Sequence, residues 1–211
     1  DVHVGDEDGP EAPFRYACAR GHVGVVRELL ALTGHRVVDV HAGDWEGPEA
    51  GFRRACQHGH EAVVRELLAL TGDRQVDVHA CDEEGAEAGF RSACAGGHET
   101  VVRDLLAFSG ELAVDVHAGD ADGPESAFRL ACRYGHANVV RLLLALPAER
   151  AVDIHAGDRV GPEYGFRWAC YLGHLAVLRE LLGVVGDGAI DVHVADGTGP
   201  DVGFRSACER G

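Results

Sequence analysis

The stretch FRRACQHGHEAVVRELLALTGDRQVDVHA (residues 52–80) decides the fold, because a nearly identical stretch, FRSACAGGHETVVRDLLAFSGELAVDVHA (residues 90–118), follows 38 residues later. A regular period of this size predicts a repeat protein in which neighbouring units bury each other's apolar faces. The triplet Asp-Val-His, or once Asp-Ile-His, marks each unit and begins at Asp1, Asp39, Asp77, Asp115, Asp153 and Asp191. We therefore expect one domain, residues 1–211, with the repeats 1–38, 39–76, 77–114, 115–152, 153–190 and a partial repeat 191–211.

The second repeat shows what one unit contains. Residues 39–47 are rich in Gly and Asp, which predicts an extended, hairpin-like loop. Residues 48–59 begin with Pro48 and Glu49, which suit the first turn of a helix. Residues 60–70 have the apolar spacing of a second helix, and a Thr-Gly pair ends it. The expected fold class is all-α, a solenoid of helix–turn–helix units with extended hairpin loops.

The segments GHEAVVRELL (59–68) and DVHAGDWEG (39–47) resemble the second helix and the hairpin of ankyrin repeats, and the resemblance covers the whole chain. The chain departs from that family in its 38-residue unit, against about 33. It also lacks the family's Thr-Pro-Leu-His, where it has EAGFR (49–53) and close variants. An acid and an Arg four residues apart predict an exposed helical ion pair worth about 0.2–0.5 kcal/mol. The resemblance implies a protein-binding concave face formed by hairpin tips and first helices.

Composition narrows the classes of function. The net charge is −16 and all 19 basic residues are Arg, so the chain is expected to repel nucleic acid. No apolar run is long enough to span a membrane. No nucleophile–base pair, phosphate-binding loop or paired catalytic carboxylate stands out from the repeats. We therefore expect no enzyme activity and no cofactor.

Cysteine recurs once in every repeat. Equivalent positions on packed helices lie about 8–10 Å apart, beyond the roughly 7 Å limit for a disulfide. We expect small, buried, unpaired side chains, which are typical of a reducing compartment such as the cytoplasm. An extracellular location would also be compatible with a filament built from this chain. The six periodic cysteines are Cys18, Cys56, Cys94, Cys132, Cys170 and Cys208, and Cys81 is the exception to the period.

Histidine, aspartate and arginine also form columns, which raises the question of metal sites. Repeat-spaced columns do not converge on bonds of about 2 Å, so we expect no metal site and interpret the histidines as hydrogen-bonding groups that fix the turns. His79, Cys81 and Asp82 are the one local group of mixed ligand types, and we interpret Cys81 as a chance substitution. The Arg column of the second helices predicts a solvated face of ion pairs.

The residues that change between repeats predict the binding surface. Four variable unit positions, the twelfth, sixteenth, nineteenth and twentieth, are spaced as one stripe along the first helix, and we expect that stripe to face outward. Exposed Tyr and Trp on a rigid surface are typical interface anchors, although packing between repeats would also account for these rings. The predicted binding residues are Tyr16, Trp45, Leu130, Tyr134, Tyr164, Trp168, Tyr171 and Leu172, most of them in the fourth and fifth repeats.

These observations predict a non-catalytic protein-binding scaffold. The alternative is a structural protein that assembles end to end into a filament. The first repeat keeps the apolar Val25 and Val26 on its second helix, and Phe204 has no second helix after it, so both ends are expected to present apolar surface. Repeated head-to-tail contact would give a fibre. The expected partner is therefore another protein, or copies of this chain bound through uncapped ends.

Overall fold

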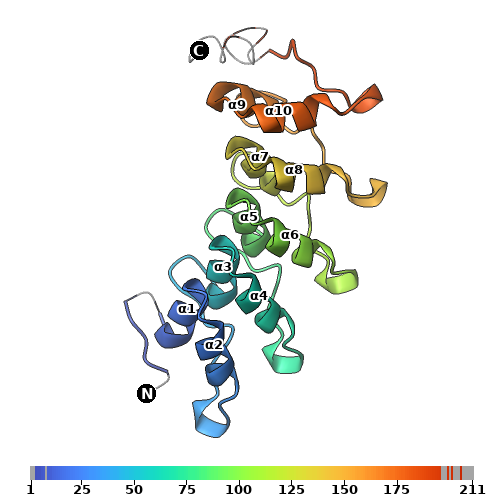
Figure 1. The fold of residues 1–211 in the computed structure, drawn as a ribbon. Helices are drawn as coiled ribbons and strands as arrows, with labels where there is room; N and C mark the ends of the chain where they lie inside the picture. The colour runs from blue at the N-terminus through green and yellow to red at the C-terminus, as the bar shows by residue number, and fades with distance from the viewer. Residues whose placement is uncertain (1–2, 8, 196–198, 200, 202–204, 206–211) are drawn as a thin grey trace. The chain divides into compact units, whose positions relative to one another are not determined.

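A computed structural model describes residues 3–7, 9–195, 199, 201 and 205. In this part of the chain helices follow one another in pairs, and no strand is present (Figure 1). The predicted all-α solenoid of helix pairs is confirmed. The first helix expected in the sixth repeat, with Phe204 and Cys208, lies outside the described residues. The helices are α1 (Ala12–Ala19), α2 (Val23–Leu30), α3 (Ala50–Gln57), α4 (Glu61–Leu68), α5 (Ala88–Ala95), α6 (Glu99–Leu106), α7 (Ser126–Arg133), α8 (Ala137–Leu144), α9 (Tyr164–Leu172) and α10 (Leu175–Leu182).

The chain forms two compact units. The N-terminal unit comprises residues 1–93 and 100–114, and the C-terminal unit comprises residues 94–99 and 115–211. In the N-terminal unit α1 packs against α2 and α3, and α4 packs against α2 and α3. In the C-terminal unit α7 packs against α8 and α9, and α10 packs against α8 and α9. Each unit is thus a stack of helix pairs, while the single domain with the repeat boundaries given above stays a prediction.

The constant residues of each repeat form the core. In the second repeat Phe52, Cys56, Val64 and Leu67 are at most 1% exposed. Full burial of an apolar side chain of this size stabilises the fold by about 1.5–3 kcal/mol.

The five periodic cysteines that the structure describes are free thiols, as predicted, and Cys18, Cys56, Cys94 and Cys132 are buried. Burial raises the pKa of Cys18 to about 12, which disfavours the reactive thiolate. Cys170 was expected to be buried too, but it is only half-buried.

The first helices begin later than the sequence predicts. Pro48 precedes α3, and Glu49 takes the left-handed conformation, with φ 55°, before the helix starts at Ala50. A non-glycine residue in this conformation costs about 1–3 kcal/mol unless its surroundings hold it there. The same conformation recurs, with φ of 54–57°, at Glu11, Glu87, Glu125, Glu163 and Asp201.

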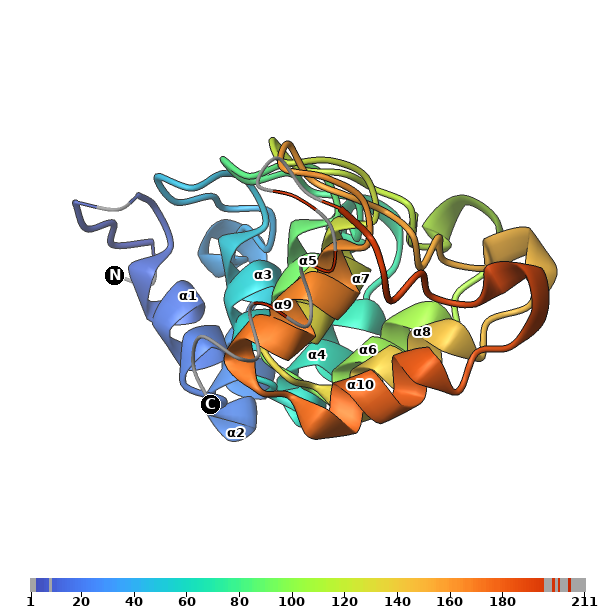
Figure 2. The same ribbon diagram turned by 90° about the horizontal axis from the view of Figure 1, so that it is seen from above.

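The loops before the first helices end in tight tips. An isolated bridge joins Asp44 to Gly47, and a Cβ on Gly47 would lie only 2.6 Å from the carbonyl oxygen of Cys81 in the next hairpin. Only glycine fits there, at φ 143°, so consecutive tips of the N-terminal unit are in close contact. Short 3₁₀ turns follow the second helices, and Figure 2 shows two of them, η4 and η5, beyond the ends of α8 and α10. The turns are η1 (Gly34–Arg36), η2 (Gly72–Arg74), η3 (Gly110–Leu112), η4 (Ala148–Arg150) and η5 (Gly186–Gly188).

Candidate binding surface

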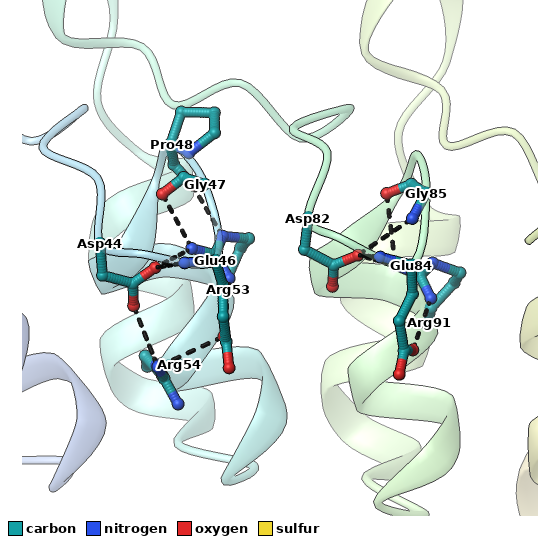
Figure 3. Close-up of polar contacts among 10 residues, drawn as sticks. All are labelled: Asp44, Glu46, Gly47, Pro48, Arg53, Arg54, Asp82, Glu84, Gly85 and Arg91. Carbon is teal, nitrogen blue, oxygen red and sulfur yellow. Dashed lines mark hydrogen bonds and ion pairs between the residues drawn. The ribbon is translucent and has the colours of Figure 1, made fainter. Parts of the chain in front are cut away.

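A buried arginine fixes the backbone of each hairpin tip. In the second repeat Arg53 extends from α3 beneath the tip, with only 4% of its side chain exposed (Figure 3). It donates to Asp44 Oδ1 at 2.5 Å, and its other hydrogen bonds reach the carbonyl oxygens of Gly47 at 2.9 Å and Pro48 at 2.7 Å. A planar guanidinium suits this role, because its donors reach a carboxylate and several carbonyl groups at once.

The same arrangement recurs in the other described repeats. Arg91 binds Asp82 and the carbonyl oxygens of Gly85 and Ala86. The predicted exposed ion pair between an acid and an Arg four residues later is therefore wrong. The acid precedes the helix, so the two side chains point to different partners, and the arginine lies inside. The arginines of this column are Arg15, Arg53, Arg91, Arg129 and Arg167, each 2–7% exposed.

Asp44 is the acidic centre of the second tip. Its carboxylate accepts from Arg53 through one oxygen and from Arg54 through the other, and its side chain is 2% exposed. Burial alone would raise the pKa of Asp44, but the hydrogen bonds and charges of Arg53 and Arg54 outweigh burial and hold that pKa below its ordinary value. The ion pair thus stays charged at neutral pH.

The two residues between the Asp and the Gly of each tip differ from repeat to repeat. Trp45 and Glu46 occupy the second tip, and Trp45 is 61% exposed. Glu46 is half-buried, with 26% of its side chain exposed. The tip residues of this kind that the structure describes in the other repeats are all exposed, and they are Glu7, Glu83, Glu84, Ala121, Asp122, Arg159 and Val160. Each tip therefore combines a fixed backbone with variable exposed side chains.

A second network, built on the left-handed glutamates, joins consecutive repeats. Glu49 is 2% exposed, and its Oε1 lies 2.5 Å from Nδ1 of His41 in the same repeat. The same oxygen accepts from the backbone N–H of Asp77 in the next repeat, at 3.0 Å. Nε2 of His41 lies 2.9 Å from the carbonyl oxygen of Asp73. These bonds hold Glu49 in its strained conformation, and sequence reasoning missed its role.

The surroundings of His41 determine its protonation. A carbonyl oxygen only accepts hydrogen bonds, so Nε2 must carry a proton towards Asp73. A neutral imidazole has one N–H, and the contact between Nδ1 and Glu49 therefore requires one proton more. The hydrogen bond to Glu49, and next the bond to the Asp73 carbonyl, raise the pKa of His41. His3 and His79 bind the equivalent glutamate and carbonyl oxygen in their own repeats, and their pKa values are raised for the same reasons.

The histidines before the second helices also bind backbone. His60 Nε2 lies 2.9 Å from the carbonyl oxygen of Ala19, and His136 Nε2 lies 2.7 Å from that of Ala95. The prediction that histidines fix the turns by hydrogen bonding is confirmed at these positions. No group of three or more potential ligands placed to hold a metal occurs within the part of the chain that the structure describes.

The second helices carry the predicted solvated ion pairs. Arg27 contacts Glu66 at 2.6 Å and Arg65 contacts Asp104 at 2.7 Å, with both arginine side chains more than half exposed. Such pairs contribute about 0.2–1 kcal/mol each. Among the described residues no helix has the length and apolar character needed to cross a bilayer.

Two of the sequence-predicted binding residues lie in the N-terminal unit, and both are exposed. Tyr16 is 54% exposed, and its hydroxyl donates to Asp6 Oδ2 at 2.6 Å. Trp45 stands at the second hairpin tip, 61% exposed. The other six residues lie in the C-terminal unit.

The C-terminal unit gathers four of its rings around one arginine. The ring of Trp168 lies 5.9 Å from that of Tyr164 and 5.5 Å from that of Tyr171, measured between centroids. The guanidinium carbon of Arg133 lies 4.5 Å from the centroid of Trp168 and 5.8 Å from that of Tyr134. Sequence reasoning did not single out Arg133, which links the rings by cation–π contacts.

Exposure within this aromatic group is uneven. Tyr134 is 51% exposed and Leu172 is 37% exposed, whereas Leu130, Trp168 and Tyr171 are half-buried.

The expectation that the whole stripe faces outward is wrong at its first position. Tyr164 is 3% exposed, and its ring lies under the guanidinium of Arg129 at 4.9 Å. The first turn of these helices is packed inside in every described repeat, and the equivalent residues, Ala12, Ala50, Ala88 and Ser126, are at most 5% exposed.

The comparison with protein families agrees with this geometry. A family model for ankyrin repeats matches residues 52–158 in three copies, which is just over half of the chain. No curated protein matches the chain. Ankyrin repeats generally mediate protein–protein interactions and are typically non-catalytic scaffolds. With the family match and the stacked helix pairs together, the chain belongs to the ankyrin-repeat family.

Proposed function

We propose that this protein is a scaffold that binds another protein through its hairpin tips and the outward part of its first helices. The observation that carries this proposal is the contrast at each tip, where a buried Arg fixes the backbone and the exposed residues differ between repeats. A backbone held in this way loses little conformational entropy on binding, so exposed side chains can contribute most of their burial energy to affinity.

The aromatic side chains supply the anchors. Trp45 and Tyr16 in the N-terminal unit, and Tyr134 in the C-terminal unit, are each more than half exposed. Large amphipathic rings of this kind dominate the energetics of protein interfaces. Tyr164 supports the surface from beneath, because its ring is buried between Arg129 and Trp168.

A photo-crosslinking amino acid at Tyr134 is expected to trap the partner in lysate of the source organism. The matched control carries the same crosslinker at Leu175, which is 57% exposed but lies on the second helix α10. Once the partner is purified, Tyr134→Ala should weaken its affinity by about thirtyfold, as expected for a central anchor worth about 2 kcal/mol. Equal products from both positions, or an unchanged affinity, would contradict the proposal.

End-to-end assembly is a second candidate, favoured by the exposure of Val25. Val25 is 51% exposed, whereas the equivalent Val63 and Val101 are fully buried by neighbouring repeats. Val26, which the sequence suggested as part of the outer face, is itself fully buried. An apolar face of this kind would accept a further repeat or a second copy.

Val25→Glu tests the assembly without disturbing the core. If copies associate through this face, light scattering by the unmodified protein should rise with concentration. The Val25→Glu variant should remain a monomer, because a carboxylate is costly to bury at the contact. Scattering from the unmodified protein that is flat across concentration would remove this candidate.

A further inference from the structure

We propose that the pocket between the second and third hairpin tips binds an arginine side chain from a basic segment of the protein partner. The inference rests on the proposed protein-binding function and names the chemistry that one part of that surface recognises. The pocket has a volume of about 230 Å³.

The pocket is formed by residues of the N-terminal unit alone. Trp45 and Glu46 line it from the second tip, Glu83 and Glu84 line it from the third tip, and the first helices close its base. Its remaining lining residues are Arg53, Gln57, Asp82 and Ser92. A volume of this size is below the roughly 300–1,000 Å³ typical of small-molecule sites and suits a single long side chain.

The charge of the pocket favours a cation. Glu46, Asp82, Glu83 and Glu84 contribute four carboxylates, and Arg53 is the single basic residue in the lining. Arg53 is already bound to Asp44 and to Glu46, at 3.2 Å for the latter.

Figure 3 shows that Arg91 lies on the inner side of the third tip, where it pairs with Asp82 and with Glu84 at 3.1 Å. The side chain of Glu84 is nevertheless 74% exposed, and Glu83 beside it is exposed too. The carboxylates of the third tip therefore still present negative charge to solvent.

The indole of Trp45 adds a second feature that selects a cation. The other tryptophan of this chain, Trp168, already holds such a cation: the guanidinium of Arg133 lies 4.5 Å from its ring centroid. Among the described residues no guanidinium of the chain covers Trp45 in this way, and the indole is 61% exposed. Trp45 therefore offers an exposed aromatic face next to the exposed carboxylates of Glu83 and Glu84.

Arginine fits this combination better than other side chains. Its planar guanidinium can stack on an indole and donate to a carboxylate in the same plane. An acidic or phosphorylated segment would be repelled by the lining carboxylates and by the net charge of −16. The expected occupant is thus an arginine of a basic, extended protein segment.

The test uses the full chain with Trp168→Phe, so that Trp45 is its only tryptophan. The probes are a short peptide that alternates Gly with Arg and the same peptide with uncharged citrulline in place of Arg. The Arg peptide is expected to change the Trp45 fluorescence saturably, and the citrulline peptide is not. Calorimetry with Trp45→Ala in the natural background should show affinity for the Arg peptide reduced by about tenfold.

A matched pair of variants separates the pocket from general electrostatic attraction. Glu83→Gln, in the pocket, is expected to weaken binding by about three- to tenfold, and Glu28→Gln, an exposed acid on α2, by less than twofold. Both remove one negative charge. No binding, equal binding of the citrulline peptide, or equal effects of the two variants would overturn the proposal. If crosslinking at Tyr134 still traps a partner in that case, the protein-binding function stands and only the arginine pocket fails.

Discussion

Arg53→Ala is expected to lower the free energy of unfolding by about 3–5 kcal/mol, the usual result of removing one partner from a buried ion pair. The side chain of Asp44, which is 2% exposed in the parent, would lose its main counter-charge. The carbonyl oxygens of Gly47 and Pro48 would each lose one donor as well, although Gly47 keeps the N–H of Asp44. Urea unfolding followed by circular dichroism measures the loss.

The neighbouring Arg54 provides the matched control. It also pairs with Asp44, at 3.1 Å, but its side chain is 26% exposed. Arg54→Ala should therefore cost about 1 kcal/mol or less. In the double variant Arg53→Ala/Asp44→Ala part of the loss should be recovered, because no carboxylate is left unpaired. Equal losses for Arg53→Ala and Arg54→Ala would show that burial of the guanidinium is not what fixes the tip.

The fold could be predicted because its determinants are local and repeated. Phe52 and Cys56 keep one face of the first helix apolar, and the Val-Val and Leu-Leu pairs of residues 63–68 do the same for the second helix. Since the same spacing returns every 38 residues, stacking of the helix pairs follows from the need to bury both faces.

The buried Glu and Arg columns could not be predicted from spacing, because the spacing of Glu49 and Arg53 fits an i,i+4 pair within one helix. Glu49 has a positive φ and lies before α3, so the i,i+4 geometry does not exist. Invariance between repeats would not have corrected this, because the exposed arginines of the second helices, such as Arg27 and Arg65, are also Arg in each of the first five repeats.

The binding surface was predictable in part for a related reason. Tyr16 and Tyr134 are exposed as expected from their variability, but Tyr164 is buried. Its equivalents in the earlier repeats are Ala or Ser, and such small residues indicate a packed position. The contact of Tyr164 with Arg129 of the preceding repeat depends on tertiary packing, which no spacing rule contains.

The N-terminal unit is expected to lose stability as the pH rises above the ordinary histidine pKa of about 6.5. Hydrogen bonds to a glutamate, and then to a backbone carbonyl, raise the folded-state pKa of His3, His41 and His79. In that pH range the folded state binds more protons than the unfolded state, so the free energy of unfolding falls with increasing pH. The stabilisation by these protonated histidines is complete below their pKa in the unfolded chain. It is lost as the pH rises through their raised pKa in the folded protein.

Thermal unfolding at about pH 6 and about pH 9 measures this loss. Salt of about 0.3 M screens the general repulsion of an acidic chain and leaves the short contacts largely intact. The midpoint of the parent should be lower at the higher pH. His22→Gln should keep the same dependence, because His22 is an exposed imidazole outside the network.

Glu49→Gln/Glu87→Gln should flatten the pH dependence. The glutamine amide N–H can donate to Nδ1 of a neutral imidazole, while Nε2–H still donates to the carbonyl oxygen of Asp73 or Glu111. In the parent one oxygen of Glu49 makes both contacts, so the amide must rotate for its oxygen to accept from the backbone N–H of Asp77 while its N–H faces His41. His41 and His79 would then need no extra proton, so the difference in unfolding temperature between the two pH values should be clearly smaller than in the parent, and the intact His3–Glu11 pair accounts for the remainder. If the thermal midpoint of the variant changes with pH as much as that of the parent, these histidine–glutamate pairs do not hold the proton. In that case only the backbone contacts hold the glutamates in the left-handed conformation.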